Sequence, residues 1–404
     1  MSTSLLYHGF GIQEYRYVCT EYHAGNIIFT IKRKPFTLRC PCCKEKKVIR
    51  HGTMVRWFHS LPIGRKATYI KAYIPRIECT DCQITRQVNI GFADSRRTYT
   101  KSLERYVLDL SKHMTIKDVA IHLRLSWDVV KSIQKRNLKK LYKNPRLKDL
   151  KQIAIDEINI GKGRYLTVLL NLKTGAVVFV GDGKGSDALE PFWEKIKRKR
   201  SVKIKAVAID MSPAYTKAVR ENLPNAKIVY DHFHVIKLFN EKLSDFRRLL
   251  FNTASDILGK SVLKGSRWLL LTAREKLAKK KDKVARLETA LALNEPLATV
   301  YYMKEDLRQL WSWDDKCTAS WHMDSWIAMA RESGIGMLKK FANTLQRHRD
   351  GVLAYYNYKI STGPLEGTNN KIKTMKRQAY GFRDIEFFKL KIMALHETKY
   401  ALVG

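Results

Sequence analysis

Two aspartates interrupt segments that would otherwise form apolar β-strands. Asp156 lies inside the segment IAIDEI, and Asp210 lies at the end of the strand predicted in the segment AVAIDM. An ionised carboxylate that is buried without a partner costs several kcal/mol, so each of these groups needs a cation nearby. In a strongly basic chain a Lys or Arg could serve, which would be a purely structural role. The alternative is a divalent cation held between converging carboxylates.

A third carboxylate, Glu366, is the single acid in a segment otherwise rich in bases, STGPLEGTNNKIKTMKRQAYGF (residues 361–382). Pro364 predicts that a helix begins here, because proline is favoured in the first turn of a helix. Three further residues follow Glu366 at helical spacing along one face, namely Asn370, Lys373 and Arg377. We expect this face to bind DNA phosphates.

Glu366 would be a third metal ligand if its helix packs beside the strand of Asp156. Carboxylate oxygens are the donors that Mg²⁺ prefers, with water and substrate phosphate completing the shell. Two such ions about 3.5–4 Å apart could activate a nucleophile and stabilise a leaving oxygen. A solvated surface glutamate is the alternative.

Four cysteines form two C-x-x-C pairs, Cys40 with Cys43 and Cys79 with Cys82. Two such pairs on hairpin turns make a tetrahedral thiolate site for structural zinc. Four Cys ligands leave no open position, which argues against a catalytic role for that metal. Unbound buried thiols are the alternative. Cys42 is a spare thiol beside the first pair, so the sequence leaves the choice of ligand there open.

The charge of the 404-residue chain indicates a polyphosphate partner. Lys and Arg number 76 against 38 Asp and Glu, a net charge of +38, and binding phosphates would release their counterions. Ribosomal and other purely binding proteins share this property, so charge alone does not indicate an enzyme. The odd number of cysteines, seven, and the lack of a secretory signal argue against a disulfide framework. We expect a cytoplasmic protein without a membrane span.

The first part of the chain divides into two predicted domains. Residues 1–95 alternate apolar and polar positions, which predicts strands and turns that carry the cysteines, a zinc-ribbon-like module. Residues 96–148 are predicted to be helical, and Thr115 and Ser126 can each cap a short helix. The second helix is rich in Lys and Arg, which is typical of a helix-turn-helix that binds DNA. An ordinary helical hairpin is the alternative. The residues that would face the DNA groove are Asp128, Lys131 and Ser132.

Residues 149–404 are predicted to form an α/β domain. Three strands in close succession are followed by a helix, a strand, a helix and a strand, which matches a ribonuclease-H-like order. The first and fourth strands of that sheet are adjacent, so Asp156 and Asp210 would lie side by side. An all-α insertion at about residues 246–355 would interrupt this core. The helical region holds five tryptophans, which are expected in a buried helical core, with a base-stacking platform as the alternative: Trp268, Trp311, Trp313, Trp321 and Trp326.

Two other acids could compete for the site. Glu157 neighbours Asp156 but points to the opposite face of the sheet, so Asp156 is preferred. Asp231 ends a strand in the segment DHFH and could position the substrate or the metal ligands. The histidines of that segment, His232 and His234, are weak evidence for a second zinc site.

The order of the motifs resembles a known family. The C-P-x-C module with HG after it, the later C-x-x-C, the helix-turn-helix, and then IDE, AIDMSPAY, DHFHV and GPLEGTNNKIK follow one another along the chain. Together they are similar to bacterial insertion-sequence transposases of the DDE type, the ISL-three family, over nearly the whole length. The resemblance implies Asp156, Asp210 and Glu366 as the catalytic triad, with Lys373 as a base seven positions after the glutamate. One departure is Cys42, where the family more often has a residue such as His.

The resemblance implies a DNA strand transferase. It would bind the terminal inverted repeats of an insertion sequence and cleave and transfer DNA strands with Mg²⁺ or Mn²⁺. Its partners would be double-stranded DNA, as element ends and as target, and a second copy of itself in a homodimer or larger homo-oligomer. It would associate with the bacterial nucleoid. The alternative is a non-catalytic DNA-binding regulator derived from a transposase, which the intact carboxylates disfavour. A ribonuclease or resolvase would not need the two N-terminal modules.

Overall fold

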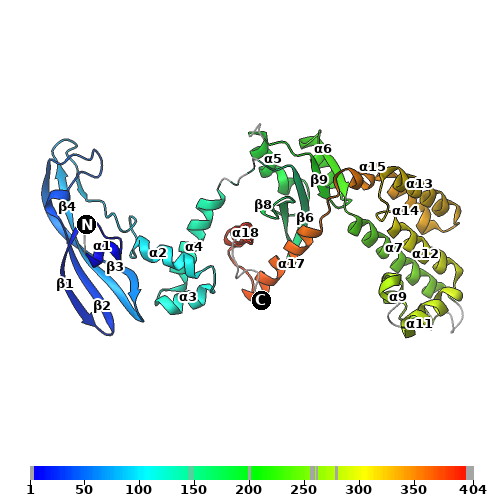
Figure 1. The fold of residues 1–404 in the computed structure, drawn as a ribbon, viewed down its shortest axis with the longest axis horizontal. Helices are drawn as coiled ribbons and strands as arrows, with labels where there is room; N and C mark the ends of the chain where they lie inside the picture. Colours follow the sequence, from blue (N-terminus) through cyan, green and yellow to red (C-terminus); the bar gives the residue numbers. More distant parts are fainter. Residues whose placement is uncertain are drawn as a thin grey trace. The chain divides into compact units, whose positions relative to one another are not determined.

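The computed structural model describes residues 4–143, 145, 147, 149–198, 202–254, 260, 263–277 and 281–396. The chain forms two compact units that divide between residues 143 and 144 (Figure 1). Among the described residues, no helix combines the length and the apolar character that crossing a bilayer requires.

The first unit contains a five-stranded sheet. Its strands are β1 (Tyr15–His23), β2 (Asn26–Arg33), β3 (Val48–Ile63), β4 (Lys66–Cys79) and β5 (Thr85–Gln87), in the spatial order β1-β2-β4-β3 with β5 beside β4. Helix α1 (Leu5–His8) precedes them, and the short helix η1 (Pro35–Thr37) follows β2. Strands β3 and β4 form one long antiparallel hairpin. Its open end brings the two segments that hold the cysteine pairs together.

Three helices complete the first unit. They are α2 (Lys101–Leu110), α3 (Ile116–Leu123) and α4 (Trp127–Tyr142). The side chain of Thr115 caps α3 by accepting from the backbone N–H of Asp118, and Ser126 caps α4 in the same way. Arg124 takes a left-handed conformation with φ of 51° and ends α3, so α4 leaves in a new direction. The two predicted caps and the short turn between α3 and α4 are confirmed.

The second unit contains a five-stranded mixed sheet. Its strands are β6 (Gln152–Gly161), β7 (Arg164–Asn171), β8 (Val177–Asp182), β9 (Ala206–Ile209) and β10 (Lys227–Tyr230), in the spatial order β10-β9-β6-β7-β8. Strands β6, β7 and β8 are antiparallel, whereas β9 and β10 run parallel to β6. The connecting helices are η2 (Asp187–Leu189), α5 (Glu190–Lys197) and α6 (Pro213–Asn222). The α/β character predicted for this region is confirmed.

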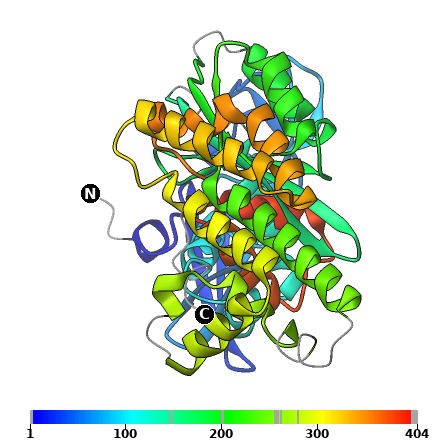
Figure 2. The same ribbon diagram turned by 90° about the vertical axis from the view of Figure 1, so that its right-hand side faces the viewer.

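A helical region lies between β10 and the last two helices. Its described helices are α7 (His232–Thr253), α9 (Arg267–Leu271), α10 (Arg274–Leu277), α11 (Lys281–Ala292), α12 (Glu295–Gln309), α13 (Lys316–Glu332), α14 (Gly336–Arg347), α15 (Arg349–Leu353) and α16 (Tyr355–Tyr358). Figure 2 shows several of them side by side, and α7 packs against both α12 and α14.

Helix α7 starts directly after β10, where Asp231 caps it. The expectation that the tryptophans of this region are buried needs correction. Trp326 is buried as predicted, whereas Trp268 and Trp321 are each 70% exposed. Trp321 precedes Trp326 by five residues on α13, which puts the two indoles on different faces of one helix.

The chain then returns to the sheet of the second unit. Helix α17 (Gly363–Gln378) packs against β6, and α18 (Ile385–Met393) packs against β8. The buried side of α17 consists of Leu365, Thr368, Asn369, Ile372 and Met375.

One buried carboxylate joins the two ends of the helical region. Asp231, which is 2% exposed, accepts a hydrogen bond from the backbone N–H of Phe233 at 2.9 Å at the start of α7. Its other oxygen accepts from the backbone N–H of Thr362 at 2.8 Å and from the Thr362 hydroxyl. The end of β10, the start of α7 and the start of α17 therefore meet at Asp231.

Replacing Asp231 with Ala should destabilise the protein by about 2–4 kcal/mol, because the buried Thr362 N–H and hydroxyl would lose their acceptor. Urea unfolding of the full chain measures this change. Asp245→Ala is the matched control, since Asp245 is also on α7 but its side chain is 62% exposed, and it should change stability by no more than about 0.5 kcal/mol. Equal stability of the two variants would contradict the role given to Asp231.

Candidate active site and DNA-binding modules

The two cysteine pairs occupy equivalent turns at the open end of the β3–β4 hairpin. Val48 pairs with Cys79 in the sheet register, which places the second pair beside the residues that follow the first. In each turn the N–H of the fifth residue donates to the carbonyl of the first Cys, from Lys44 to Cys40 at 3.1 Å and from Gln83 to Cys79 at 2.9 Å. Both donors have a left-handed backbone, so the two turns present their thiols in the same way.

The four thiols form one cluster. The sulfur atoms of Cys40, Cys43, Cys79 and Cys82 all lie within 4.8 Å of one another, and Cys43 Sγ is 3.6 Å from Cys79 Sγ. A tetrahedral zinc site with Zn–S bonds of about 2.3 Å has sulfur–sulfur edges of about 3.8 Å. Cys42 is exposed and outside the cluster, to which it contributes its backbone N–H, 3.4 Å from Cys40 Sγ.

The electrostatics of the cluster suit a cation. Backbone hydrogen bonds, first from Cys43 and then from Cys42, lower the pKa of the Cys40 thiol to about 6. A side-chain hydrogen bond with Cys43, and then burial, raise the pKa of the Cys82 thiol to about 12, because both favour the protonated thiol. Four thiolates can exist together here only with a positive ion between them, so the donor set fits zinc.

The helix α4 presents an outward face. Asp128 and Ser132 are exposed, and Lys131 is half-buried with its Nζ 5.2 Å from the centre of the Trp127 ring. The inward face of the helix consists of Val130, Ile133 and Gln134. The three residues predicted to face DNA therefore lie outside the buried face.

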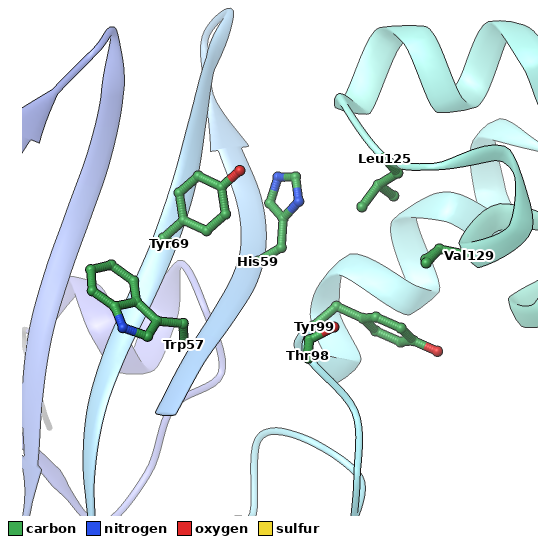
Figure 3. A pocket seen from close by; sticks show the side chains of 7 residues that line it. All are labelled: Trp57, His59, Tyr69, Thr98, Tyr99, Leu125 and Val129. Atoms are coloured by element: carbon green, nitrogen blue, oxygen red, sulfur yellow. The ribbon is translucent and has the colours of Figure 1, made fainter. Parts of the chain in front are cut away.

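An aromatic pocket lies between the sheet and these helices (Figure 3). Its volume is about 290 Å³, and it is lined by Trp57, His59, Tyr69, Thr98, Tyr99, Leu125 and Val129. The backbone N–H of His59 donates to Thr98 at 2.8 Å, and that of Thr100 donates to His59 at 2.9 Å. These bonds extend the pairing of β3 to the segment that leads into α2. The cysteine-bearing sheet and the helix-turn-helix thus belong to one unit, a connection that the sequence did not reveal.

In the second unit, adjacent strands bring Asp156 and Asp210 to the same level. Ala154 on β6 pairs with Ala208 on β9 in parallel register. Each aspartate lies two residues beyond its alanine, and the period of two puts both side chains on one face. Asp210 also accepts from the backbone N–H of Ser212 at 2.9 Å, which orients its carboxylate.

Asp156 carries an unfavourable charge. Burial first, and then the nearby carboxylates of Glu157 and Asp210, raise its pKa to about 6, whereas His234 opposes the shift. Asp156 accepts hydrogen bonds from the backbone N–H of Glu157 and from Asn369 Nδ2, each at 2.8 Å. Two hydrogen bonds thus orient the carboxylate of Asp156, but neither donor carries a positive charge. A bound cation would supply that charge.

Helix α17 runs from the end of β10 to β6. Thr362 at its start is bonded to Asp231 after β10, and Asn369 is bonded to Asp156 on β6. Glu366 lies four residues after the first contact and three before the second, on the same side of the helix. It therefore belongs to the part of α17 between these two contacts.

Asp156, Asp210 and Glu366 do not form a closed ligand set in the part of the chain that the structure describes. Among the described residues, only the four cysteines form a group of three or more potential ligands with all donor atoms within 4.8 Å. Glu366 is exposed. Carboxylate oxygens are donors that fit a hard divalent cation. The raised pKa of Asp156 indicates that the positive charge of such a cation is needed beside this carboxylate. The predicted DNA-binding residues of α17, Asn370, Lys373 and Arg377, are exposed as well.

The competing acid Glu157 belongs to the other side of the sheet. It pairs with Thr167 on β7, whose hydroxyl lies 3.1 Å from Tyr215 Oη on α6. Burial first, and then the Glu157 carboxylate, raise the pKa of Tyr215. Asp156 instead contacts α17. The sequence analysis did not single out Asn369, which contacts Asp156. Its position was a possible signal, because a residue three positions after Glu366 lies on the same face of the helix.

Comparisons with known proteins bear on the whole chain. Residues 153–392 match the profile of a family described as transposase, the DDE type of the ISL3 group, and residues 88–136 match the helix-turn-helix domain of transposase family ISL3. The transposase for insertion sequence element IS1001 of Bordetella parapertussis is 30% identical over 391 residues, 96% of this chain and 95% of that protein. The transposase for insertion sequence element IS1557 of Mycobacterium tuberculosis (strain CDC 1551 / Oshkosh) is 28% identical over 370 residues, 85% and 82% of the two chains.

The fold and the comparisons together define an insertion-sequence transposase with a helix-turn-helix and a DDE-type domain. The chain belongs to the ISL3 family, which confirms the family that the order of its motifs indicated.

The thiol cluster makes a prediction about metal content. The purified full chain should contain about one zinc, since a structural site contributes binding free energy on the order of 10 kcal/mol or more to folding. Cys43→Ser should lose that zinc, and Cys42→Ser, the matched control, should keep it. Elemental analysis of the three proteins decides. Zinc lost from Cys42→Ser and kept in Cys43→Ser would move the ligand to Cys42.

A second prediction concerns the charge of Asp156. Its pKa of about 6 in the folded protein exceeds its ordinary value of 3.8, so the folded state binds the proton more tightly and loses stability as the pH rises between these values. Asp156→Asn should therefore stabilise the Mg²⁺-free, zinc-loaded protein at pH 8 by about 1–3 kcal/mol. Asn369 can turn its amide over to bond the new side chain.

Unfolding curves between pH 5 and pH 8 measure this gain, which should shrink as the pH falls. Added Mg²⁺ should stabilise the wild type more than Asp156→Asn. A gain that does not depend on pH would contradict a buried charge at Asp156.

Proposed function

We propose that the protein binds the terminal inverted repeats of its insertion sequence and catalyses DNA cleavage and strand transfer with Asp156, Asp210 and Glu366. The observation that carries this proposal is the position of Asp156 and Asp210 at one level of adjacent strands, with the helix of Glu366 packed against the strand of Asp156. The sheet order β10-β9-β6-β7-β8 supports a ribonuclease-H-like core. The helices between β10 and α17 support an all-α insertion into that core.

The three carboxylates would hold Mg²⁺ or Mn²⁺, which supplies positive charge to the scissile phosphate and to the attacking oxygen. The chain itself positions the DNA. Lys373 lies two turns beyond Glu366 on the same face of α17, where its ammonium can bind a phosphate as a point charge. Asn370 and Arg377 extend this face along the backbone of the DNA.

The reaction consists of two in-line displacements at phosphorus. In the first, water attacks the phosphodiester at the element end, the P–O3′ bond breaks, and a free 3′ hydroxyl remains. In the second, that hydroxyl attacks a phosphodiester of the target DNA, and a new P–O bond replaces the one that breaks. Neither step needs a covalent bond between DNA and protein.

The first unit would recognise the element ends. Residues 1–95 form the zinc module in this proposal, and residues 96–148 hold the helix-turn-helix, whose helix α4 enters the major groove. Lys131 and Ser132 would contact the DNA there. The net charge of +38 favours phosphate contacts. Joining two ends requires at least a homodimer, and the bacterial nucleoid in the cytoplasm is where the substrate lies.

Strand cleavage separates this proposal from the alternative of a non-catalytic DNA-binding regulator. Asp156→Ala, Asp210→Ala and Glu366→Ala should each retain binding to labelled DNA that carries the element's own ends. Each should lose cleavage by more than the roughly 10–100-fold that removal of an outer-shell partner of a metal costs. Glu157→Gln is the matched control on the opposite face and should still cleave.

A gel assay of end cleavage with Mg²⁺ compares the four variants. Full cleavage by the three alanine variants would refute the triad. A wild type that binds element ends but never cleaves them would favour the regulator.

A further inference from the structure

The buried side-chain amide of Asn369 has a hydrogen-bond partner for its nitrogen but none for its oxygen among the described residues. It lies on α17 and is 5% exposed. Its Nδ2 donates to Asp156 Oδ2 at 2.8 Å. Its Oδ1 is buried and has no hydrogen-bond partner among the residues that the structure describes. A buried amide oxygen without a partner is costly, so this atom calls for a donor.

The direction of the amide follows from its surroundings. With the amide turned over, Oδ1 would face Asp156 Oδ2, and two acceptors would repel each other. An ionised Asp156 therefore fixes Nδ2 toward itself and leaves Oδ1 on the other side of the carboxamide. A water molecule in the shell of a metal ion at Asp156 is a strong donor, because the ion polarises its O–H bonds.

The helix holds Asn369 firmly against β6. On one side of it, Thr362 is bonded to Asp231. On the other side, Lys376 Nζ donates to the carbonyl of Ile160 near the end of β6. Asn369 lies between these two attachments. Its neighbour Asn370 is exposed and shares none of these contacts.

We propose that Asn369 is a positioning residue of the catalytic site, where Nδ2 orients the Asp156 carboxylate and Oδ1 accepts a hydrogen bond from a water of the divalent ion's shell. The inference rests on the proposed function, in which Asp156 is a metal ligand. Partners of this kind orient the ligands of a metal and tune its affinity. Binding of the ion would also tighten the contact between β6 and the helix that carries Glu366.

Titration with Mn²⁺ tests this role in the zinc-loaded full chain, with free Mn²⁺ measured by electron paramagnetic resonance. Asn369→Ala should bind Mn²⁺ about 10–100-fold more weakly than the wild type. Asn369→Leu keeps the volume of the side chain but has no polar atoms, so it should weaken Mn²⁺ binding to the same extent. This variant replaces Asn369→Ala in the test if the alanine variant does not fold. Asn370→Ala, the matched control, should keep the wild-type Mn²⁺ affinity. Thermal unfolding without Mn²⁺ identifies the folded variants.

Asp156→Ala makes the possible failures distinguishable. Folded Asn369 variants with wild-type Mn²⁺ affinity, beside an Asp156→Ala variant that has lost Mn²⁺ binding, would overturn the role of Asn369 and leave the proposed function intact. Wild-type Mn²⁺ affinity in Asp156→Ala would overturn the metal site itself, and the role of Asn369 with it.

Discussion

Asp156 bears a carboxylate on a strand whose neighbour is followed directly by a second carboxylate, Asp210, and burial opposes the ionisation of Asp156. Folding alone gains nothing from two acids placed in this way, because apolar residues there would pack at lower cost. The ionised carboxylate of Asp156 therefore destabilises the sheet until a cation binds beside it. The surrounding structure serves to hold it, through the Glu157 backbone on one oxygen and Asn369 on the other.

Long-range hydrogen bonds link this position to the rest of the second unit. Asp231 fastens the start of α17 to the end of β10 after the chain has passed through the whole helical region. Lys376 fastens the same helix to the end of β6. Glu366 lies between these attachments and is exposed, so it remains accessible to a ligand while its helix is fixed.

Much of this arrangement follows from local patterns. The strand order brought Asp156 and Asp210 to neighbouring strands, and the side chains of Thr115 and Ser126 predicted two helix starts. The spacing of the cysteines predicted the thiol cluster, while its geometry leaves Cys42 outside. The contact between Asn369 and Asp156 spans 213 positions, and no periodicity reveals which residue of a helix meets which strand. The burial of the tryptophans was only partly predicted for a related reason, since their faces depend on how the helices pack.

Anomalous X-ray scattering from Mn²⁺ in crystals of the full chain bound to DNA of the element end would locate the metal. We expect an anomalous peak within about 2.0–2.3 Å of carboxylate oxygens of both Asp156 and Asp210, with Glu366 facing the same ion or its neighbour. Mn²⁺ bound elsewhere while Asp156 and Asp210 keep their metal-free contacts, in a complex that cleaves the DNA, would contradict this expectation.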